Sequence, residues 1–332
     1  MLLKASFQEL DKALNYSMDV RIKNFGRKIY FYIPTFLTYK TNFISFPPET
    51  YPSFSITGES CMLHCLHCNG RLLKGMIPVR SPEELIYFCE KFKRKGAVGC
   101  LISGGCTLAG NVPLEAFLDA IHYIKRKLKF RVSIHTGFIR DKFVAQRLSE
   151  AGVDSILIDV VGSDDTLREI YRLNFGVKGV EESLKILHEA RIPIVPHVLV
   201  GLHYGQIVGE FKALKLISKY DPKAVVIIVL TPLRGTPMEK ITPPNPQDIA
   251  KIIVYARLLL QSVPIVLGCA RPVGKHRTET DKLAVKAGIN AIVLPSNEAV
   301  YMAEIIGLES IFKPTCCSHI YQDIHKLNYG KH

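Results

Sequence analysis

The sequence of 332 residues lacks a membrane span, since no run of about 18 apolar residues is free of charge. The first residues, MLLKASFQELDKAL, contain acidic side chains and no continuous apolar stretch, so they do not resemble a secretory signal. Low-complexity segments are also absent, and no basic segment is interleaved with aromatic residues as in many nucleic-acid-binding proteins. These absences argue against a membrane protein, favour a cytoplasmic location and make nucleic acid an unlikely partner.

The composition indicates a basic protein with a substantial hydrophobic core. Hydrophobic residues make up 48% of the chain, and 43 basic residues against 30 acidic ones give a formal charge of +13. Such a field attracts polyanions or acidic proteins, although a basic surface with no particular partner explains it equally well. Nine cysteines in a cytoplasmic protein point to metal binding or catalysis rather than to disulfides.

A unit of apolar strand, loop and amphipathic helix recurs from Pro52 onward. The sequence predicts strands at Ser53–Thr57, Ala97–Ser103, Arg131–His135, Ser155–Val160, Ile194–Val200, Ala224–Leu230, Pro264–Gly268 and Ala291–Leu294. Eight such units over roughly 250 residues predict an α/β fold, a (β/α)8 TIM-type barrel. A six-unit open barrel is the alternative, and the last two strands favour closure.

The rest of the chain is predicted to flank this barrel. Residues 1–52 would form an N-terminal extension with a helix, the β-rich segment Lys28–Phe36 and a proline-bearing strap. Residues 53–310 would form the barrel. Residues 311–332 would form a cysteine-bearing tail without a long helix, folded over the barrel mouth.

Three cysteines stand out between Cys61 and Cys68, where the sequence reads CMLHCLHC. Thiolates at this C-x3-C-x2-C spacing can hold three irons of a cubane 4Fe–4S cluster and leave the fourth open to a small molecule. Zinc is the alternative, because His64 and His67 interleave the cysteines and zinc accepts both residue types. Zinc sites usually pair C-x2-C with distant ligands, so the spacing favours the cluster.

The motif resembles that of the radical S-adenosylmethionine (SAM) superfamily. The resemblance implies that SAM chelates the open iron through its amino and carboxylate groups. An electron from an external donor, passed through the cluster, would then release a 5′-deoxyadenosyl radical. Cys61, Cys65 and Cys68 would bind this cluster, with His67 as a further cofactor-binding candidate.

The loops after the later strands supply candidates for the SAM pocket, because barrel enzymes place their chemistry at the carboxyl ends of the strands. Gly104 and Gly105 match the family's Gly-Gly-Glu, but Cys106 replaces its glutamate, which puts a thiol beside SAM. Asp159 ends an apolar strand and needs a polar partner such as the ribose or a structural ion pair. Gly201 and Leu202 lie in VGLHYG, which resembles the family's stretch that packs on adenine.

The remaining cysteines are predicted to divide into two kinds. Cys89 and Cys100 fall on a helix face and within a strand, where free cysteine packs well. The others lie on loops or strand ends and are candidates for an auxiliary iron–sulfur cluster: Cys106, Cys269, Cys316 and Cys317. A vicinal pair that supplies two ligands to one cluster is unusual, so one of Cys316 and Cys317 is a candidate for a spare thiol. A redox-active or merely exposed tail pair is the alternative. Cys106 and Arg271 are the catalytic candidates, and Arg271 with Lys275 and Arg277 would attract an acidic partner.

Over most of residues 53–310 the chain resembles the biotin-synthase branch, and most closely the archaeal biotin-synthase-related proteins, two of which act together as a lipoyl synthase. The stretches that carry this resemblance are CMLHCLHCNGRLLKGMIP, ISGGCTLAGNVPLEAF and PHVLVGLHYG. The N-terminal C-x4-C-x5-C and the terminal Arg-Ser-Ser-Tyr of bacterial lipoyl synthase are missing. The resemblance implies sulfur insertion into an octanoyl chain on an acidic lipoyl domain or carrier protein, with a second radical SAM protein as a further partner. A single-cluster enzyme that rearranges or methylates, an RNA-modifying enzyme and a zinc-binding interaction protein are the other readings.

Overall fold

The computed structural model describes residues 6–35 and 43–328. Its strands form one parallel sheet in the order β11-β1-β10-β9-β8-β7-β6-β5-β4-β2-β3. Their bounds are β1 Lys28–Tyr32, β2 Ser53–Ser55, β3 Ile77–Pro78, β4 Gly99–Ser103, β5 Arg131–His135, β6 Ser155–Asp159, β7 Ile194–Val200, β8 Val225–Val229, β9 Ile265–Leu267, β10 Ala291–Val293 and β11 Glu309–Lys313. Because all neighbours are parallel, the carboxyl ends of the strands share one end of the molecule, called the mouth below.

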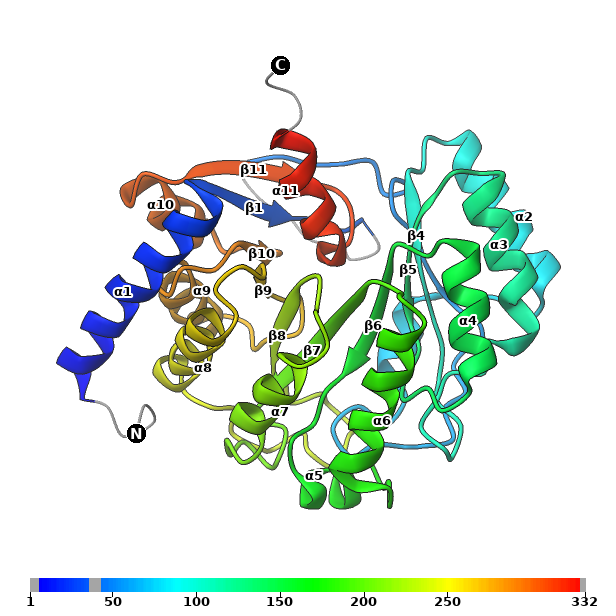
Figure 1. The fold of residues 1–332 in the computed structure, drawn as a ribbon, viewed down its shortest axis with the longest axis horizontal. Coiled ribbons are helices and arrows are strands. Elements are labelled where there is room, and N and C mark those ends of the chain that lie inside the picture. Colours follow the sequence, from blue (N-terminus) through cyan, green and yellow to red (C-terminus); the bar gives the residue numbers. More distant parts are fainter. Residues whose placement is uncertain (1–5, 36–42, 329–332) are drawn as a thin grey trace.

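Figure 1 shows the sheet curled around an interior, with helices along its outer side. The outer helices are α1 Phe7–Phe25, α2 Pro82–Arg94, α3 Leu118–Arg126, α4 Lys142–Ala151, α5 Asp164–Glu169, α6 Gly176–Glu189, α7 Glu210–Ile217, α8 Pro246–Leu259, α9 Lys275–Lys286 and α10 Asn297–Ile305. Single-turn 3-10 helices lie at η2 Arg71–Gly75, η3 Glu115–Phe117 and η4 Cys317–His319, and α11 spans Ile320–Asn328. No helix of residues 6–35 and 43–328 has the length and apolar character needed to cross a bilayer.

Strand β8 shows why its residues form a strand buried on both faces. Val225, Ile227 and Val229 pack in the main core between sheet and helices. Val226 points the other way, into a second apolar cluster inside the curl that also contains Tyr32. A continuous β-branched run is what a parallel strand covered on both sides requires.

The α/β fold class is confirmed, and all eight predicted strands are present within about two residues of their expected ends. The N-terminal extension, however, is part of the sheet, because β1 lies between β10 and β11. Among the described strands, none pairs β10 or β11 with β2 or β3, so the sheet curls without a closed ring of ladders. At this gap the Tyr51 amide donates to the Thr35 hydroxyl at 2.8 Å.

The C-terminal tail does not lie over the mouth, and that prediction is wrong. Arg131, the first residue of β5, donates to Asp323 of α11 at 3.1 Å. Tyr321 of the same helix donates to the carbonyl of Asp154, the residue before β6. The segment therefore closes the amino-terminal end of the curled sheet.

Fully buried polar groups hold the tail at that end. The Ser133 hydroxyl lies 2.7 Å from that of Ser318 and 3.2 Å from Nε2 of His319. The Tyr51 hydroxyl also lies 2.8 Å from this Nε2. Buried polar groups are costly without partners, so these matched donors and acceptors fix where the tail enters.

Candidate functional site

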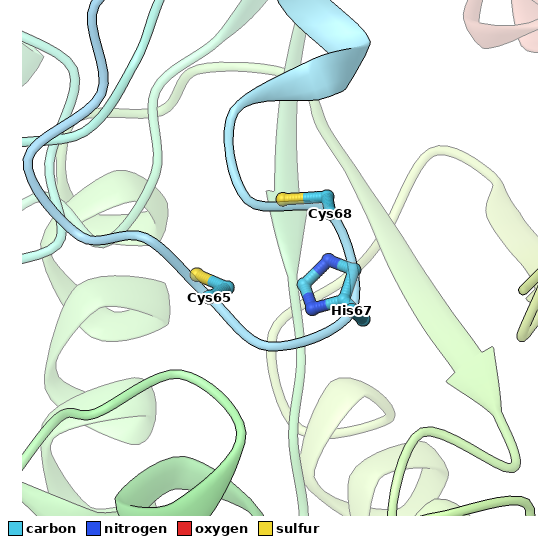
Figure 2. A group of neighbouring side chains, drawn as sticks. All are labelled: Cys65, His67 and Cys68. Atoms are coloured by element: carbon cyan, nitrogen blue, oxygen red, sulfur yellow. The ribbon is translucent and has the colours of Figure 1, made fainter. Parts of the chain in front are cut away.

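The Cys61–Cys68 loop leaves the carboxyl end of β2 and leads into η2, so it lies at the mouth. Ligand atoms of Cys65, His67 and Cys68 lie within 4.8 Å of one another. Figure 2 shows the sulfur atoms of Cys65 and Cys68 on the same side of the loop, with the His67 ring beside them. The loop is anchored by hydrogen bonds from the amides of Met62 and Leu66 to Cys106 O and Ile170 O, each 2.9 Å long.

Hydrogen bonding in this loop prepares a thiolate. A hydrogen bond from Cys65 and a further one from His67 lower the pKa of Cys68 to about 4, against the opposing effect of burial. The same hydrogen bond raises the pKa of Cys65. Burial is the largest influence on His67 and lowers its pKa, but the hydrogen bond with Cys68 and the charges of Cys68 and Asp159 together outweigh it, and the net shift is upward.

The residues at this loop fit an iron–sulfur cluster. Three thiols from one loop form a suitable donor set for three irons. The buried Nδ1 of His67 has no hydrogen-bond partner among the described residues, as expected for an atom that faces a bound group. His67 is also held in place by its ring contact with Tyr171, at 5.4 Å between centroids.

Gly104 and Gly105 follow β4. Gly104 packs against Ile56 and Thr57, which follow β2, and Gly105 packs directly on the start of the cluster loop. A Cβ on Gly105 would lie 1.9 Å from Ser60 O and 2.6 Å from the Cα of Cys61. The Gly105 amide donates to the Thr57 hydroxyl at 2.7 Å. The sequence predicted glycine here for approach to a ligand, and the structure adds a nearer reason, which is contact with the loop itself.

Asp159, at the carboxyl end of β6, lies among polar side chains that face the interior. The Tyr171 hydroxyl donates to its Oδ2 at 2.8 Å. His135 of β5 and His197 of β7 lie on the strands beside it, with their ring centroids 5.4 Å apart. Burial lowers the pKa of His135, and burial together with His135 lowers the pKa of His197 to about 4.

The sequence analysis missed His135, His197 and Tyr171. His135 ends β5, and His197 lies at the middle of β7 in register with Asp159, so the alternation of side chains in these strands was a usable signal. Tyr171 follows α5, and no sequence feature places it against Asp159.

Gly201 and Leu202 form a tight turn at the end of β7. The Gly201 amide donates to Glu210 Oε1 at 2.8 Å, and its φ of +78° suits glycine. Leu202 and Asp159 line the same small cavity of about 20 Å³, which has room for a single water. The turn therefore reaches the polar cluster around Asp159, although adenine would need more space than this cavity offers.

Three of the four auxiliary-cluster candidates lie together inside the curl. Cys269, Cys316 and Cys317 belong to the inner apolar cluster. A hydrogen bond from Cys317 lowers the pKa of Cys316 to about 7. Burial raises the pKa of Cys269, and the neighbouring Cys316 adds to that rise. Three enclosed thiols are a donor set that fits a second iron–sulfur cluster.

Cys106 does not join this group. It packs against the main core with Cys61, Cys65 and Cys68. Burial and then Cys61 raise the pKa of Cys106 to about 12. The auxiliary set suggested from the sequence is thus divided by the structure between the cluster loop and the interior.

Arg271 is a structural residue, which corrects its prediction as a catalytic or docking group. Its side chain is only 1% exposed. It forms a two-point ion pair with Asp281, at 2.6 and 3.0 Å. Its remaining donors reach the carbonyls of Gly268 and Val293 at 2.7 Å and of Leu294 at 3.0 Å. With its donors occupied, Arg271 has none left for a substrate.

Comparison with known proteins identifies the class to which this site belongs. A family model described as the Radical SAM superfamily matches residues 55–227, which is more than half of the chain. The chain therefore belongs to the radical SAM superfamily. A model described as the Biotin and Thiamin Synthesis associated domain matches residues 227–329, which places the chain in the biotin-synthase-related branch.

Individual relatives agree with this assignment. A biotin synthase of Prochlorococcus marinus is 26% identical over 253 residues, covering 72% of each chain. A biotin synthase of Zymomonas mobilis is 24% identical over 252 residues, covering 72% of this chain and 71% of the relative. Among solved structures, a methylornithine synthase matches with a TM-score of 0.63 and 16% identity, covering 97% of this chain and 94% of the other. A FeFe-hydrogenase maturase matches with a TM-score of 0.68 and 14% identity, covering 99% and 75%.

These matches imply three cofactors for the chain: a 4Fe–4S cluster, SAM and a second iron–sulfur cluster. The cluster loop supplies the residues expected for the first. The thiols inside the curl and the polar groups around Asp159 are the residues available to the other two.

Proposed function

We propose that this chain is a sulfur-inserting radical SAM enzyme, a component of a lipoyl synthase that acts on a protein-bound octanoyl chain. The observation that carries the proposal is the group of three thiols, Cys269, Cys316 and Cys317, inside the same curled sheet whose mouth holds the cluster loop. When bound, the first cluster with SAM would supply the deoxyadenosyl radical, and the second cluster would supply sulfur.

The chain's own residues have distinct parts in this proposal. Cys61, Cys65 and Cys68 hold the first cluster, and His67 supports Cys68. Gly104 and Gly105 allow the loop after β4 to lie against the loop that holds the first cluster. Asp159, oriented by Tyr171, binds SAM hydroxyl groups, and the turn at Gly201 and Leu202 approaches the adenosyl end.

The interior favours an alkyl substrate. The inner cluster contains apolar side chains from neighbouring strands, among them Leu101, Leu157 and Val195. Such a lining excludes water and suits an acyl chain better than a nucleobase or phosphate. This supports the octanoyl reading over the RNA-modifying one.

The mouth offers a surface for the protein that carries the acyl chain. Met62, Leu108 and Val273 lie on loops after β2, β4 and β9 and are 58%, 69% and 75% exposed. Lys74 and Lys275 at the same end are also exposed. Apolar anchors with basic neighbours fit an acidic lipoyl domain. An external electron donor and a second radical SAM protein complete the proposed set of partners.

The first test counts iron and acid-labile sulfide per chain after anaerobic reconstitution. Wild type should hold about eight irons if both clusters have four, and the variant with Cys61, Cys65 and Cys68 replaced by Ala should hold about four. Cys316→Ser and Cys317→Ser, made separately, should show which of the pair is spare. About four irons in wild type and none in the triple variant would remove the sulfur donor and leave the single-cluster enzyme.

The second test measures the product. Wild type with an octanoylated lipoyl domain, SAM and a reductant should yield a domain whose mass shows sulfur gained and hydrogen lost. Whichever of Cys316→Ser and Cys317→Ser loses the second cluster in the iron assay should still cleave SAM but leave the domain without sulfur. SAM cleavage by wild type with no change in any octanoyl domain would contradict the lipoyl reading while leaving the two-cluster enzyme intact.

A further inference from the structure

The thiol of Cys106 belongs to the surroundings of the first cluster. The Met62 amide donates to the carbonyl of Cys106 at 2.9 Å, and the Cys61 thiol lies 4.0 Å from the same oxygen. The preceding Gly105 has no room for a Cβ, because Ser60 and Cys61 press against it. Cys106 is therefore held firmly against the cluster loop.

Cys106 also lies near Asp159. The ionisable side chains that act most strongly on it are Cys61, Asp159 and Cys68. Two of these are ligands of the cluster, and Asp159 belongs to the polar group that faces the interior. Cys106 is therefore close both to the cluster ligands and to this polar group.

We propose that Cys106 binds the fourth iron of the first cluster when SAM is absent and is displaced when SAM binds. A cubane has four irons, and the loop provides three thiolates, so one coordination site is open to a fourth sulfur. As the Cys106 Sγ–Fe bond forms, the thiol proton passes to solvent and no electron is transferred. When SAM coordinates the iron, this bond breaks and Cys106 takes up a proton.

Self-ligation of this kind has two measurable consequences. The fourth iron is retained in the enzyme without SAM, because it has a protein ligand. SAM binds more weakly than it otherwise would, because only the fraction of molecules with a free iron is competent to bind it. Both consequences depend on the superfamily cluster and are independent of the proposed sulfur insertion.

The first experiment uses the full reconstituted chain without SAM, as wild type, Cys106→Ala and Cys106→Ser. Ala109→Ser is the matched control, since it changes an exposed residue on the same loop. Each protein is treated with limited ferricyanide, and electron paramagnetic resonance measures the three-iron cluster that forms when an unprotected iron is lost. Cys106→Ala should give the most three-iron cluster, Cys106→Ser should follow it, and SAM added beforehand should suppress the signal in both. Wild type and Ala109→Ser should give little three-iron cluster.

The second experiment measures SAM affinity by equilibrium dialysis on the same proteins with the cluster in its oxidised form. Cys106→Ala should bind SAM more tightly than wild type, on the order of threefold or more, because a competing state has been removed. Ala109→Ser should match wild type. Equal three-iron yields and equal affinities in wild type and Cys106→Ala would overturn the proposal. Weaker SAM binding by Cys106→Ala would also overturn it, since Cys106 would then be a SAM contact.

Discussion

At the scale of single residues, Arg271 shows how a charge near a catalytic mouth can serve the fold alone. Its guanidinium joins α9, through Asp281, to carbonyls at the ends of β9 and β10. Replacing it with Lys keeps the charge but loses the two-point pair and several hydrogen bonds. We expect Arg271→Lys to lower the free energy of unfolding by about 3 kcal/mol, which is typical when one partner of a buried ion pair is disrupted. Anaerobic denaturant unfolding measures this.

The control for Arg271 is Lys286→Ala, which removes an exposed charge from the end of the same helix. It should leave stability within about 0.5 kcal/mol of wild type. If Arg271→Lys were as stable as wild type but had lost enzymatic activity, Arg271 would have to be considered a catalytic residue.

His197 leads to a prediction about pH. Its pKa is about 4 in the folded chain because of burial and the neighbouring His135, with Asp159 opposing the shift, against an ordinary value of 6.5. Below pH 6.5 the unfolded chain takes up a proton that folded His197 does not, so stability falls as the pH drops from 6.5 towards 4. The slope should approach about 1 kcal/mol per pH unit. Above pH 6.5 both forms are neutral and the contribution to the slope vanishes.

Thermal unfolding at pH 7.5, 6.5 and 5.5 (chosen to span the ordinary histidine value) tests this with His197→Gln. The variant should lose less stability on acidification than wild type, with part of the slope remaining because the pKa of His135 is lowered too. His122→Gln, at an exposed position on α3, should keep the wild-type slope. A slope unchanged by His197→Gln would show that other groups govern acid sensitivity.

At the scale of elements, the C-terminal segment places Cys316 and Cys317 in the interior of the curled sheet. The short helix α11 is anchored through Asp323, which pairs with Arg131 at 3.1 Å and accepts from the Tyr32 hydroxyl at 2.7 Å. Asp323→Asn should weaken both contacts and cost about 3 kcal/mol, since it leaves Arg131 without its charged partner. Hydrogen exchange should rise in the peptide that contains Cys316, Cys317 and Ser318. Glu298→Gln, at an exposed position on α10, is the control. Faster exchange elsewhere, with that peptide unchanged, would contradict the anchoring role.

The elements also show where sequence reasoning succeeds and where it stops. Strands such as Val225–Val229 were predicted correctly because burial on both faces demands a local run of β-branched residues. The cluster loop was predicted because its three ligands lie within eight residues. The position of the tail was not, because it depends on Ser133 and Tyr51, which are far away in the sequence. Arg271 was misjudged because its burial depends on how the following helix, with Asp281, and the carbonyls of Val293 and Leu294 pack around it.

At the scale of the whole molecule, the thiols reach the interior from both ends. The cluster loop and Cys269, which follows β9, come from the mouth, and Cys316 and Cys317 come from the amino-terminal end, which the tail closes. In the proposed function the substrate therefore enters at the mouth, past the loops that carry Met62, Leu108 and Val273. This arrangement suits an acyl chain that reaches inward while its carrier protein stays outside.

That arrangement predicts a docking defect that leaves the chemistry intact. Leu108→Glu with Val273→Glu adds two negative charges to the rim and should weaken binding of an acidic octanoyl domain about tenfold or more, through lost apolar contact and like-charge repulsion. Cleavage of SAM without the domain should stay at the wild-type rate.

Ile305→Glu, at a residue of α10 that is 78% exposed, is the matched control and should bind the domain as wild type does. Raised salt should weaken wild-type binding if the basic neighbours contribute. If the rim variant bound the domain as wild type does, the carrier would have to dock elsewhere, and entry of the acyl chain through the mouth would no longer be supported.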